Sequence, residues 1–282
     1  MSFTFNVISS LNQVNKADWN KVTGCDYPFT RYEFLHALEV SGAVGCLGGQ
    51  NSGWQPQHLL VYKNAQLVAV MPSYIKLHSY GEYVFDHSWA NAYQHYGRVY
   101  YPKLVSTIPF TPVSGLRICI AEGNEQQPII SAISEYIIAY CEQNNLSSWH
   151  LLFPSKTLSQ ALTPQTMQRT AVHFQWFNDG FTCFDDFLAT FSSRKRKNLK
   201  KERQKIRGQQ ISLEVFTGTD IPEKIWDHFY YFYQMTYAKR SGHGGYLSKS
   251  FFQLLAQTMP EAIVLVLAKR EGQYIAGALN FR

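Results

Sequence analysis

Two carboxylates and three imidazoles occur close together between residues 78 and 117. Glu82 and Asp86 are four residues apart, and His78, His87 and His95 flank them. Ionisable groups enclosed by apolar walls are typical of ligand clefts, where the pKa of an acid or base is shifted. A core loop with hydrogen-bonded tyrosine hydroxyls would have a similar composition. For any single residue we favour that structural role. For the whole stretch we favour a ligand-binding site, because aromatic residues fill most of the gaps between the ionisable groups: Tyr80, Tyr83, Phe85, Trp89, Tyr93, Tyr96, Tyr100 and Tyr101.

A second group of residues with possible chemistry is a cationic run. Between Arg194 and Arg207 there are nine basic residues and one acid, Glu202, whereas the rest of the chain has 17 basic and 19 acidic residues. On a helix, these cations could hold phosphates through charge-assisted hydrogen bonds. The partner could be a nucleotide diphosphate, a coenzyme phosphate or RNA. A basic run by itself is often only a solvated face.

Composition narrows the class of protein. The chain has 282 residues, 45% of them hydrophobic and 15% aromatic, which suits one large or two ordinary folded domains. It has no apolar run long enough to span a membrane and no secretory signal, and its five cysteines form no CxxC pair. A cytoplasmic protein without a metal site is therefore expected. Without GxSxG or HExxH motifs, covalent and metal mechanisms are disfavoured.

Apolar periodicity predicts an α/β fold with mixed sheets. The first fifty residues should be mostly helical, with helices starting near Lys16 and Phe29 and Thr30 as the N-cap of the second. The stretch 78–117 has neither helical periodicity nor strand alternation. Other strands are expected at 116–120, 148–153, 172–176 and 211–216, hairpins at 58–75 and 262–281, and helices at 128–144, 184–208, 221–237 and 247–257.

The two predicted hairpins are similar in sequence. Residues 60–69 align with residues 267–276, and helices with apolar faces precede both. A duplicated unit, offset by about two hundred residues, would explain the similarity. We place the first unit at 1–170 and the second, including the basic helix, at 171–282. The second should be incomplete at its C-terminus, because the first continues for roughly a hundred residues beyond its hairpin.

Several segments resemble the FemAB-like family of peptidoglycan biosynthesis or recognition, whose members are predicted N-acyltransferases. PFTPVSG at 109–115 is the most specific, and the others lie at 54–60, 78–93, 100–104, 173–188, 192–203 and 246–252. The resemblance covers residues 29–282 and implies two tandem acetyltransferase-like (GNAT) units. It also implies that residues 193–198 lie near the phosphates of a nucleotide-linked or lipid-linked substrate. The donor would be acyl-CoA or aminoacyl-tRNA, although the Q/R-x-x-G-x-G/A turn for coenzyme A phosphates is missing from the sequence.

This resemblance suggests roles in acyl transfer to an amine of a phosphorylated or peptide-like acceptor, such as a cell-wall precursor. Glu82, Asp86 or His78 would remove the amine proton, and burial would raise the pKa of a carboxylate towards the working pH. Tyrosine hydroxyls would donate to the oxyanion or leaving group, and cations would fix an acidic acceptor. The substrate-binding candidates are Trp89, Tyr101, Lys103, Arg117 and Tyr246, with Arg196, Lys197, Lys200 and Arg203 on the basic helix.

Two other functions fit the sequence. A non-catalytic module would recognise a phosphate-bearing cell-wall precursor or RNA, such as tRNA, through the helix at 194–207, and salt would weaken its binding. A peripheral membrane protein is less favoured, because the core should take up the apolar side of that helix. The transferase hypothesis requires the acidic stretch and the basic helix to border one crevice.

Overall fold

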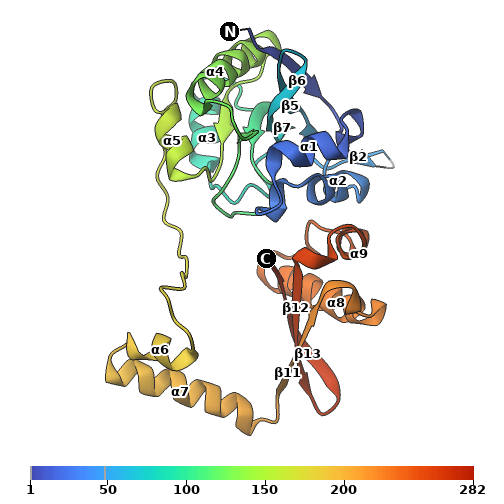
Figure 1. Ribbon diagram of the computed structural model, residues 1–282, viewed down its shortest axis with the longest axis vertical. Coiled ribbons are helices and arrows are strands. Elements are labelled where there is room, and N and C mark those ends of the chain that lie inside the picture. The colour runs from blue at the N-terminus through green and yellow to red at the C-terminus, as the bar shows by residue number, and fades with distance from the viewer. Residues whose placement is uncertain (1, 48) are drawn as a thin grey trace.

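Two α/β units and a long arm make up the structure (Figure 1). The computed structural model describes residues 2–47 and 49–282. The first unit contains strands β1 (Thr4–Ile8), β2 (Cys46–Leu47), β3 (Gln50–Asn51), β4 (Trp54–Pro56), β5 (His58–Lys63), β6 (Gln66–Met71), β7 (Ser73–Lys76), β8 (Lys103–Ser106), β9 (Cys119–Ile120) and β10 (Trp149–Leu151). Its helices are α1 (Lys16–Thr23), α2 (Tyr32–Val40), α3 (His87–His95), α4 (Gln126–Gln143) and α5 (Lys156–Leu162).

The rest of the chain forms the arm and the second unit. The arm, residues 163–211, begins as an extended connection and continues into helices α6 (Phe184–Ala189) and α7 (Ser193–Gly208). The second unit contains β11 (Ser212–Thr217), α8 (Glu223–Ser241), α9 (Lys249–Thr258), β12 (Ile263–Arg270) and β13 (Gln273–Phe281). Within the described ranges, no helix has both the length and the apolar character needed to cross a bilayer.

Two four-stranded sheets form the framework of the first unit. One has the order β1-β5-β6-β9, and the other has the order β10-β8-β7-β4. Only Pro72 separates β6 from β7, and a proline has no N–H with which to continue a ladder. The chain therefore crosses from one sheet to the other at this residue, and the single strand expected over 67–75 is in fact two strands.

The two units have similar topology, as a duplication would produce. Each unit contains a strand, two helices and a hairpin in that order, although the first unit has the short strands β2, β3 and β4 between its second helix and its hairpin. The three strands of each repeat pair antiparallel, as β1-β5-β6 and as β11-β12-β13. Both hairpins turn through two residues with positive φ, which is the type I′ geometry. The ladder shifts register between Val61 and Tyr62 in one hairpin and between Ala268 and Lys269 in the other. These are aligned positions, so the repeat extends to the β-bulge.

Several local expectations are wrong. The stretch 78–117 contains α3 and β8, and the N-terminal region, expected to be mostly helical, begins with β1. Arg31 caps α2 without a side-chain hydrogen bond, in place of Thr30. The long helix expected over 184–208 breaks between Ala189 and Ser193 into α6 and α7. Residues 172–176 are extended, but they pair with no strand in the part of the chain that the structure describes.

One hydrophobic core joins the two units. Phe34 of α2 meets Phe251 of α9 edge to face, with ring centroids 5.6 Å apart, and meets Phe281 of β13 at 5.8 Å. Leu60 and Val70, on one face of the sheet, belong to this same core. The opposite face of that sheet packs against α4 and α5 in a second core. The units are thus held together by buried contacts, independently of the arm that connects them.

We expect limited proteolysis to cut the arm without separating the units. Residues 170–180 are exposed and include Phe174, Trp176 and Phe177, which are sites for chymotrypsin. Because the two units share a core, the two fragments should elute together from a gel-filtration column. Phe251→Ala, which removes a buried ring from that core, should let them separate. Fragments of the unaltered protein that elute separately would contradict a shared core.

Candidate active site

A row of side chains crosses one face of the second sheet of the first unit. Lys76 on β7 is the register partner of Trp54 on β4 and of Lys103 on β8. Both lysines are fully buried. Like charges directly opposite each other on neighbouring strands are destabilising, so each lysine needs a nearby hydrogen-bond acceptor or negative charge. His150 on β10 lies on the same face, opposite Val105.

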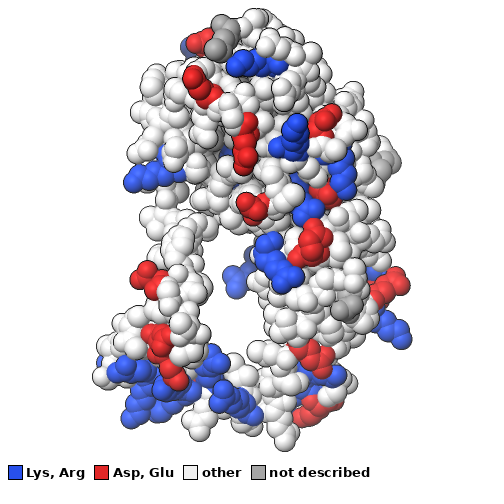
Figure 2. Space-filling model, viewed as in Figure 1, with Lys and Arg blue, Asp and Glu red and all other residues white. Residues whose placement is uncertain are grey.

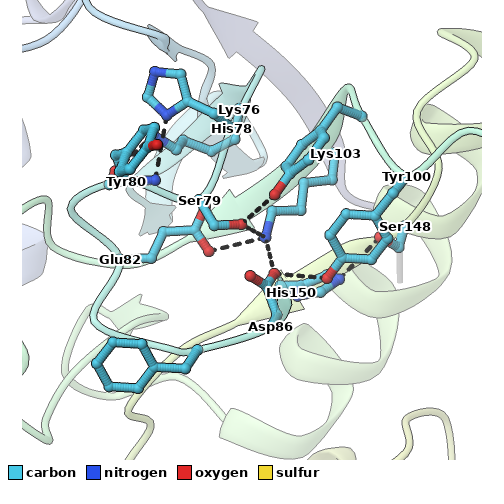
Figure 3. A network of polar contacts seen from close by, with 12 residues as sticks. Lys76, His78, Ser79, Tyr80, Glu82, Asp86, Tyr100, Lys103, Ser148 and His150 are labelled. Carbon is cyan, nitrogen blue, oxygen red and sulfur yellow. Dashed lines mark hydrogen bonds and ion pairs between the residues drawn. The ribbon is translucent and has the colours of Figure 1, made fainter. Parts of the chain in front are cut away.

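The loop from Ser79 to Asp86 folds over this row and supplies the compensating charge (Figure 3). The carbonyl of Tyr80 accepts hydrogen bonds from Trp54 Nε1 and Lys76 Nζ, each at 3.2 Å. Gly81 has a φ of +80°, and a Cβ at this position would lie 2.5 Å from the ring of Phe110. The tight approach at Gly81 therefore requires glycine and brings the following residues down onto the sheet.

Lys103 is the centre of the resulting polar cluster. Its Nζ lies 2.9 Å from Glu82 Oε2, 2.6 Å from Asp86 Oδ2 and 3.1 Å from Ser79 Oγ. The hydroxyl of Tyr100 donates to Asp86 Oδ2 at 2.7 Å. Glu82 and Asp86 are only 2% and 1% exposed, so a single ammonium group is shared by two buried carboxylates.

The two carboxylates differ in electrostatic character. Burial raises the pKa of Glu82 above its usual value, and the attraction of Lys103 offsets this only in part. Burial would also raise the pKa of Asp86, but hydrogen bonds from Lys103 and Tyr100 lower it to about 2. The expectation that burial raises both values therefore fails for Asp86. Of the two, Glu82 is the group suited to exchange a proton, and Asp86 remains an anion.

Each carboxylate also has one unused oxygen. Glu82 Oε1 and Asp86 Oδ1 are buried and have no hydrogen-bond partner in the structure. Buried polar atoms are nearly always hydrogen-bonded, and leaving one unsatisfied costs about 1–3 kcal/mol. These two atoms are thus acceptors available to a donor such as an amine.

Lys76 and His150 next to the cluster are held largely uncharged. Burial lowers the pKa of Lys76 to about 6, although the charge of Glu82 opposes this. Its Nζ lies 3.5 Å from the centroid of the Trp54 ring. Burial, followed by repulsion from Lys103, lowers the pKa of His150 to about 4. The positive charge of this face is therefore concentrated on Lys103.

Part of this cluster does not stand out in the sequence. Ser79, Tyr100, Lys76 and His150 were not among the candidates. A lysine within a predicted strand was a possible signal for Lys76. Its pairing with Lys103, however, depends on the register between β7 and β8. Tyr100 belongs to the aromatic run, where nothing in the sequence distinguishes it from its neighbours.

Three other candidates lie around the cluster with differing connections to it. The hydroxyl of Tyr101 lies 2.6 Å from Ser79 Oγ and so joins the hydrogen-bond network. His78 packs against Tyr80 and has a lowered pKa because of burial and nearby Lys76, but it makes no hydrogen bond to either carboxylate. Trp89 on α3 is 41% exposed, with the guanidinium of Arg169 5.9 Å from its ring.

Two candidates have mainly structural contacts. Arg117 is fully buried, and its nitrogens donate to the carbonyls of Leu152, Leu116 and Val113, so it has little capacity to bind an acceptor. Tyr246 of the second unit stacks on Phe110 of the first, with ring centroids 4.9 Å apart. It therefore packs beside the loop that carries the cluster, at the contact between the units.

The basic helix does not reach the cluster. The cations Arg196, Lys197, Lys200 and Arg203 lie on α7, at the far end of the arm from the first unit (Figure 1). Lys200 pairs with Asp185 of α6 at 3.4 Å, and Arg203 lies over the ring of Phe184 at 3.8 Å. The shared crevice that the sequence-based transferase hypothesis required is therefore not formed, because α7 packs on α6 and not on either unit. A transferase site in this chain would have to consist of the acid–lysine cluster without the basic helix.

The fold and the cluster define a protein of two related α/β units, with a buried acid–lysine cluster in the first unit, beside its contact with the second. In the described part of the chain, no group of three or more His, Cys, Asp or Glu side chains could hold a metal ion. The chain belongs to the FemAB-like family of peptidoglycan biosynthesis/recognition, whose model matches residues 10–282. A search of curated proteins found no match.

Several solved structures are similar to this chain, among them an aminoglycoside acetyltransferase and FemX. The aminoglycoside 6'-N-acetyltransferase AAC(6')-Ig from Acinetobacter haemolyticus is 13% identical over 62% of this chain and 99% of that protein, with a TM-score of 0.37. FemX is 10% identical over 96% of this chain and 58% of that protein, with a TM-score of 0.45. The chain thus spans little more than half the length of FemX.

Proposed function

We propose that this protein is an N-acyltransferase that transfers an acyl or aminoacyl group to an amine of a peptide-like or phosphate-bearing acceptor. Membership of a family of peptidoglycan biosynthesis or recognition supports a cell-wall precursor as that acceptor. The observation that carries the proposal is the pair of unpartnered carboxylate oxygens around Lys103, because an incoming amine supplies the donors that they lack.

In this proposal, the amine nitrogen forms the new amide bond while the C–S bond of acyl-CoA or the C–O bond of aminoacyl-tRNA breaks, and the leaving sulfur or oxygen takes up the proton that Glu82 removed from the amine. The two carboxylates have different tasks. Asp86 remains charged and orients Lys103 and the ammonium form of the acceptor through electrostatic attraction. Glu82, with its raised pKa, accepts the proton that the amine must lose before it attacks. Tyr101 and Lys103 are the donors near the carbonyl oxygen that becomes negative during attack. Both free carboxylate oxygens are covered in this structure, so the loop 79–86 must move to admit the acceptor.

A neighbouring pocket offers space for the rest of the acceptor. It has a volume of about 640 Å³ and is lined by Ala92, Tyr93, Tyr96, Arg98, Val99 and Ser147. Tyr93 packs edge to face on Tyr100, with ring centroids 5.1 Å apart, and Tyr100 holds Asp86. Arg98 makes no ion pair with any described residue and would bind a carboxylate or phosphate of the acceptor. The donor is acyl-CoA or aminoacyl-tRNA.

A transfer assay tests the proposal directly. The purified protein would be incubated with acyl-CoA or aminoacyl-tRNA and with amine-containing muramyl peptides, and new amide bonds would be detected by mass spectrometry. We expect one class of donor to give an amide product, and we expect Glu82→Gln to slow its formation by about a hundredfold or more. If neither class of donor gives a product while the protein still binds muramyl peptides, the alternative of a non-catalytic binding module holds.

A further inference from the structure

The arm exposes an unusual number of large apolar side chains. Met167 is 89% exposed, Val172 85%, Phe174 93%, and Trp176 and Phe177 are 63% and 72% exposed. They lie within one extended stretch of chain that is not paired in a sheet. Contiguous exposed apolar surface in a globular protein commonly marks a site of interaction with a protein or a membrane.

The same arm carries the net positive charge of the molecule, because residues 194–207 contain nine basic residues and one acid, whereas the rest of the chain has 17 basic and 19 acidic residues. None of the residues of α7 is buried, and its nine cations face solvent with few partners. Among the described residues, the one ion pair that α7 makes is that of Lys200 with Asp185. Figure 2 shows the cations gathered at the end of the arm, away from both units.

The apolar and cationic surfaces are physically linked. The ring of Trp176 lies 6.0 Å from that of Phe187 on α6, so the end of the extended stretch packs against the helix that holds α7. Phe187 in turn meets Phe191 at 4.9 Å, just before α7 begins. The apolar stretch and the basic helix therefore belong to one local assembly and can meet a single partner together.

We propose that the arm binds the surface of anionic membranes. Clustered lysines and arginines are attracted to anionic lipid headgroups, and neighbouring aromatic and aliphatic side chains enter the boundary between headgroups and acyl chains. Nucleic acid would match the cations and the aromatic rings, because bases stack on rings. It would leave Met167, Val172 and the half-exposed Ile206 of α7 in water, whereas a membrane buries them.

The position of α7 removes the main objection to a membrane role. That objection was that the core would take up the apolar side of the basic helix, but α7 contributes no residue to either core. The apolar stretch and the cations of the arm are therefore both free to contact a membrane. Membrane binding is independent of the proposed chemistry in the first unit, so the transfer assay and the binding experiment can succeed or fail separately.

Co-sedimentation with vesicles tests the proposal. We expect binding to vesicles of phosphatidylcholine mixed with phosphatidylglycerol, little binding to phosphatidylcholine alone, and weaker binding as salt rises. Reversing three charges with Lys197→Glu, Lys200→Glu and Lys201→Glu should weaken binding by about a hundredfold. The matched control is Lys224→Glu, Lys239→Glu and Arg240→Glu on exposed positions of α8, and it should retain binding.

A second variant separates membrane insertion from simple attraction of charges. Phe174→Ser, Trp176→Ser and Phe177→Ser leave the net charge unchanged and should weaken vesicle binding by about tenfold or more. All three positions are exposed, so the fold should survive, which circular dichroism would verify. Vesicle binding that is insensitive to this variant would overturn the proposal, as would binding to single-stranded RNA in the absence of any vesicle binding.

Discussion

Lys103→Met should lower the free energy of unfolding by about 3–5 kcal/mol, which is the usual cost of leaving a buried charge without its partner. Lys103 is fully buried and is the only cation within 4.0 Å of Glu82 and Asp86 among the described residues. Methionine fills much of the same volume, so the loss should come from electrostatics and not from a cavity. Urea denaturation at neutral pH would measure it.

The triple variant Lys103→Met, Glu82→Gln, Asp86→Asn should recover most of that loss, because it removes the unpaired charges together with the lysine. Lys269→Met is a control, since Lys269 pairs with Glu214 at the surface, where such pairs contribute about 0–1 kcal/mol. The effect of Lys103→Met should also diminish at acidic pH, where the unpaired carboxylates take up protons. Equal losses for Lys103 and Lys269 would show that the buried cluster has no special energetic role.

Glu82→Gln should reduce kcat for amide formation by about a hundredfold to ten-thousandfold, the usual contribution of a general base. Glutamine keeps the size of the side chain and can still bind near Lys103, but it cannot accept a proton. The raised pKa of Glu82 predicts that the rate of the unaltered enzyme falls as the pH drops through that value, because the protonated acid is no longer a base. This limb of the pH profile should disappear in the variant.

Glu33→Gln is the matched control for that experiment. Glu33 is also a buried carboxylate, held by Lys16 and Arg31, but it lies on α2 away from the cluster. Its replacement should affect stability while leaving kcat per folded molecule unchanged. If Glu82→Gln keeps full activity and an unchanged pH profile, Glu82 is not the base, and the cluster is a structural device of the first unit.

The parts of the fold that depend on local pattern could be predicted from sequence. Apolar alternation predicted both hairpins, and the alignment of residues 60–69 with 267–276 matches the structure down to the position of the bulge. Helix α3 was not predicted, because the mixed aromatic and polar residues of 78–117 show no clear helical repeat over the whole stretch, and none of the residues of α3 is buried. The break between α6 and α7 was missed for a different reason: the apolar residues keep their helical spacing across the short turn between the two helices.

The candidate site was predictable in composition but not in arrangement. In the sequence, Glu82 and Asp86 stand out among aromatic residues as candidate bases, and Lys103 is a candidate for substrate binding. Their meeting depends on the pairing of β7 with β8 and on the turn at Gly81, which only the three-dimensional structure provides. The position of the basic helix was predicted wrongly, because a continuous helix was assumed to carry its apolar start into the core, whereas α6 and α7 pack on each other.

The aromatic contacts of Phe29 and Phe34 with Phe281 have a consequence for biosynthesis. During synthesis the first unit leaves the ribosome well before β13, so these rings stay exposed to water until their partner Phe281, far later in the sequence, has been made. Such a delay favours aggregation of the nascent chain and capture by chaperones. Expression at low temperature or with added chaperone should therefore raise the yield of soluble protein, measured as the soluble fraction after lysis.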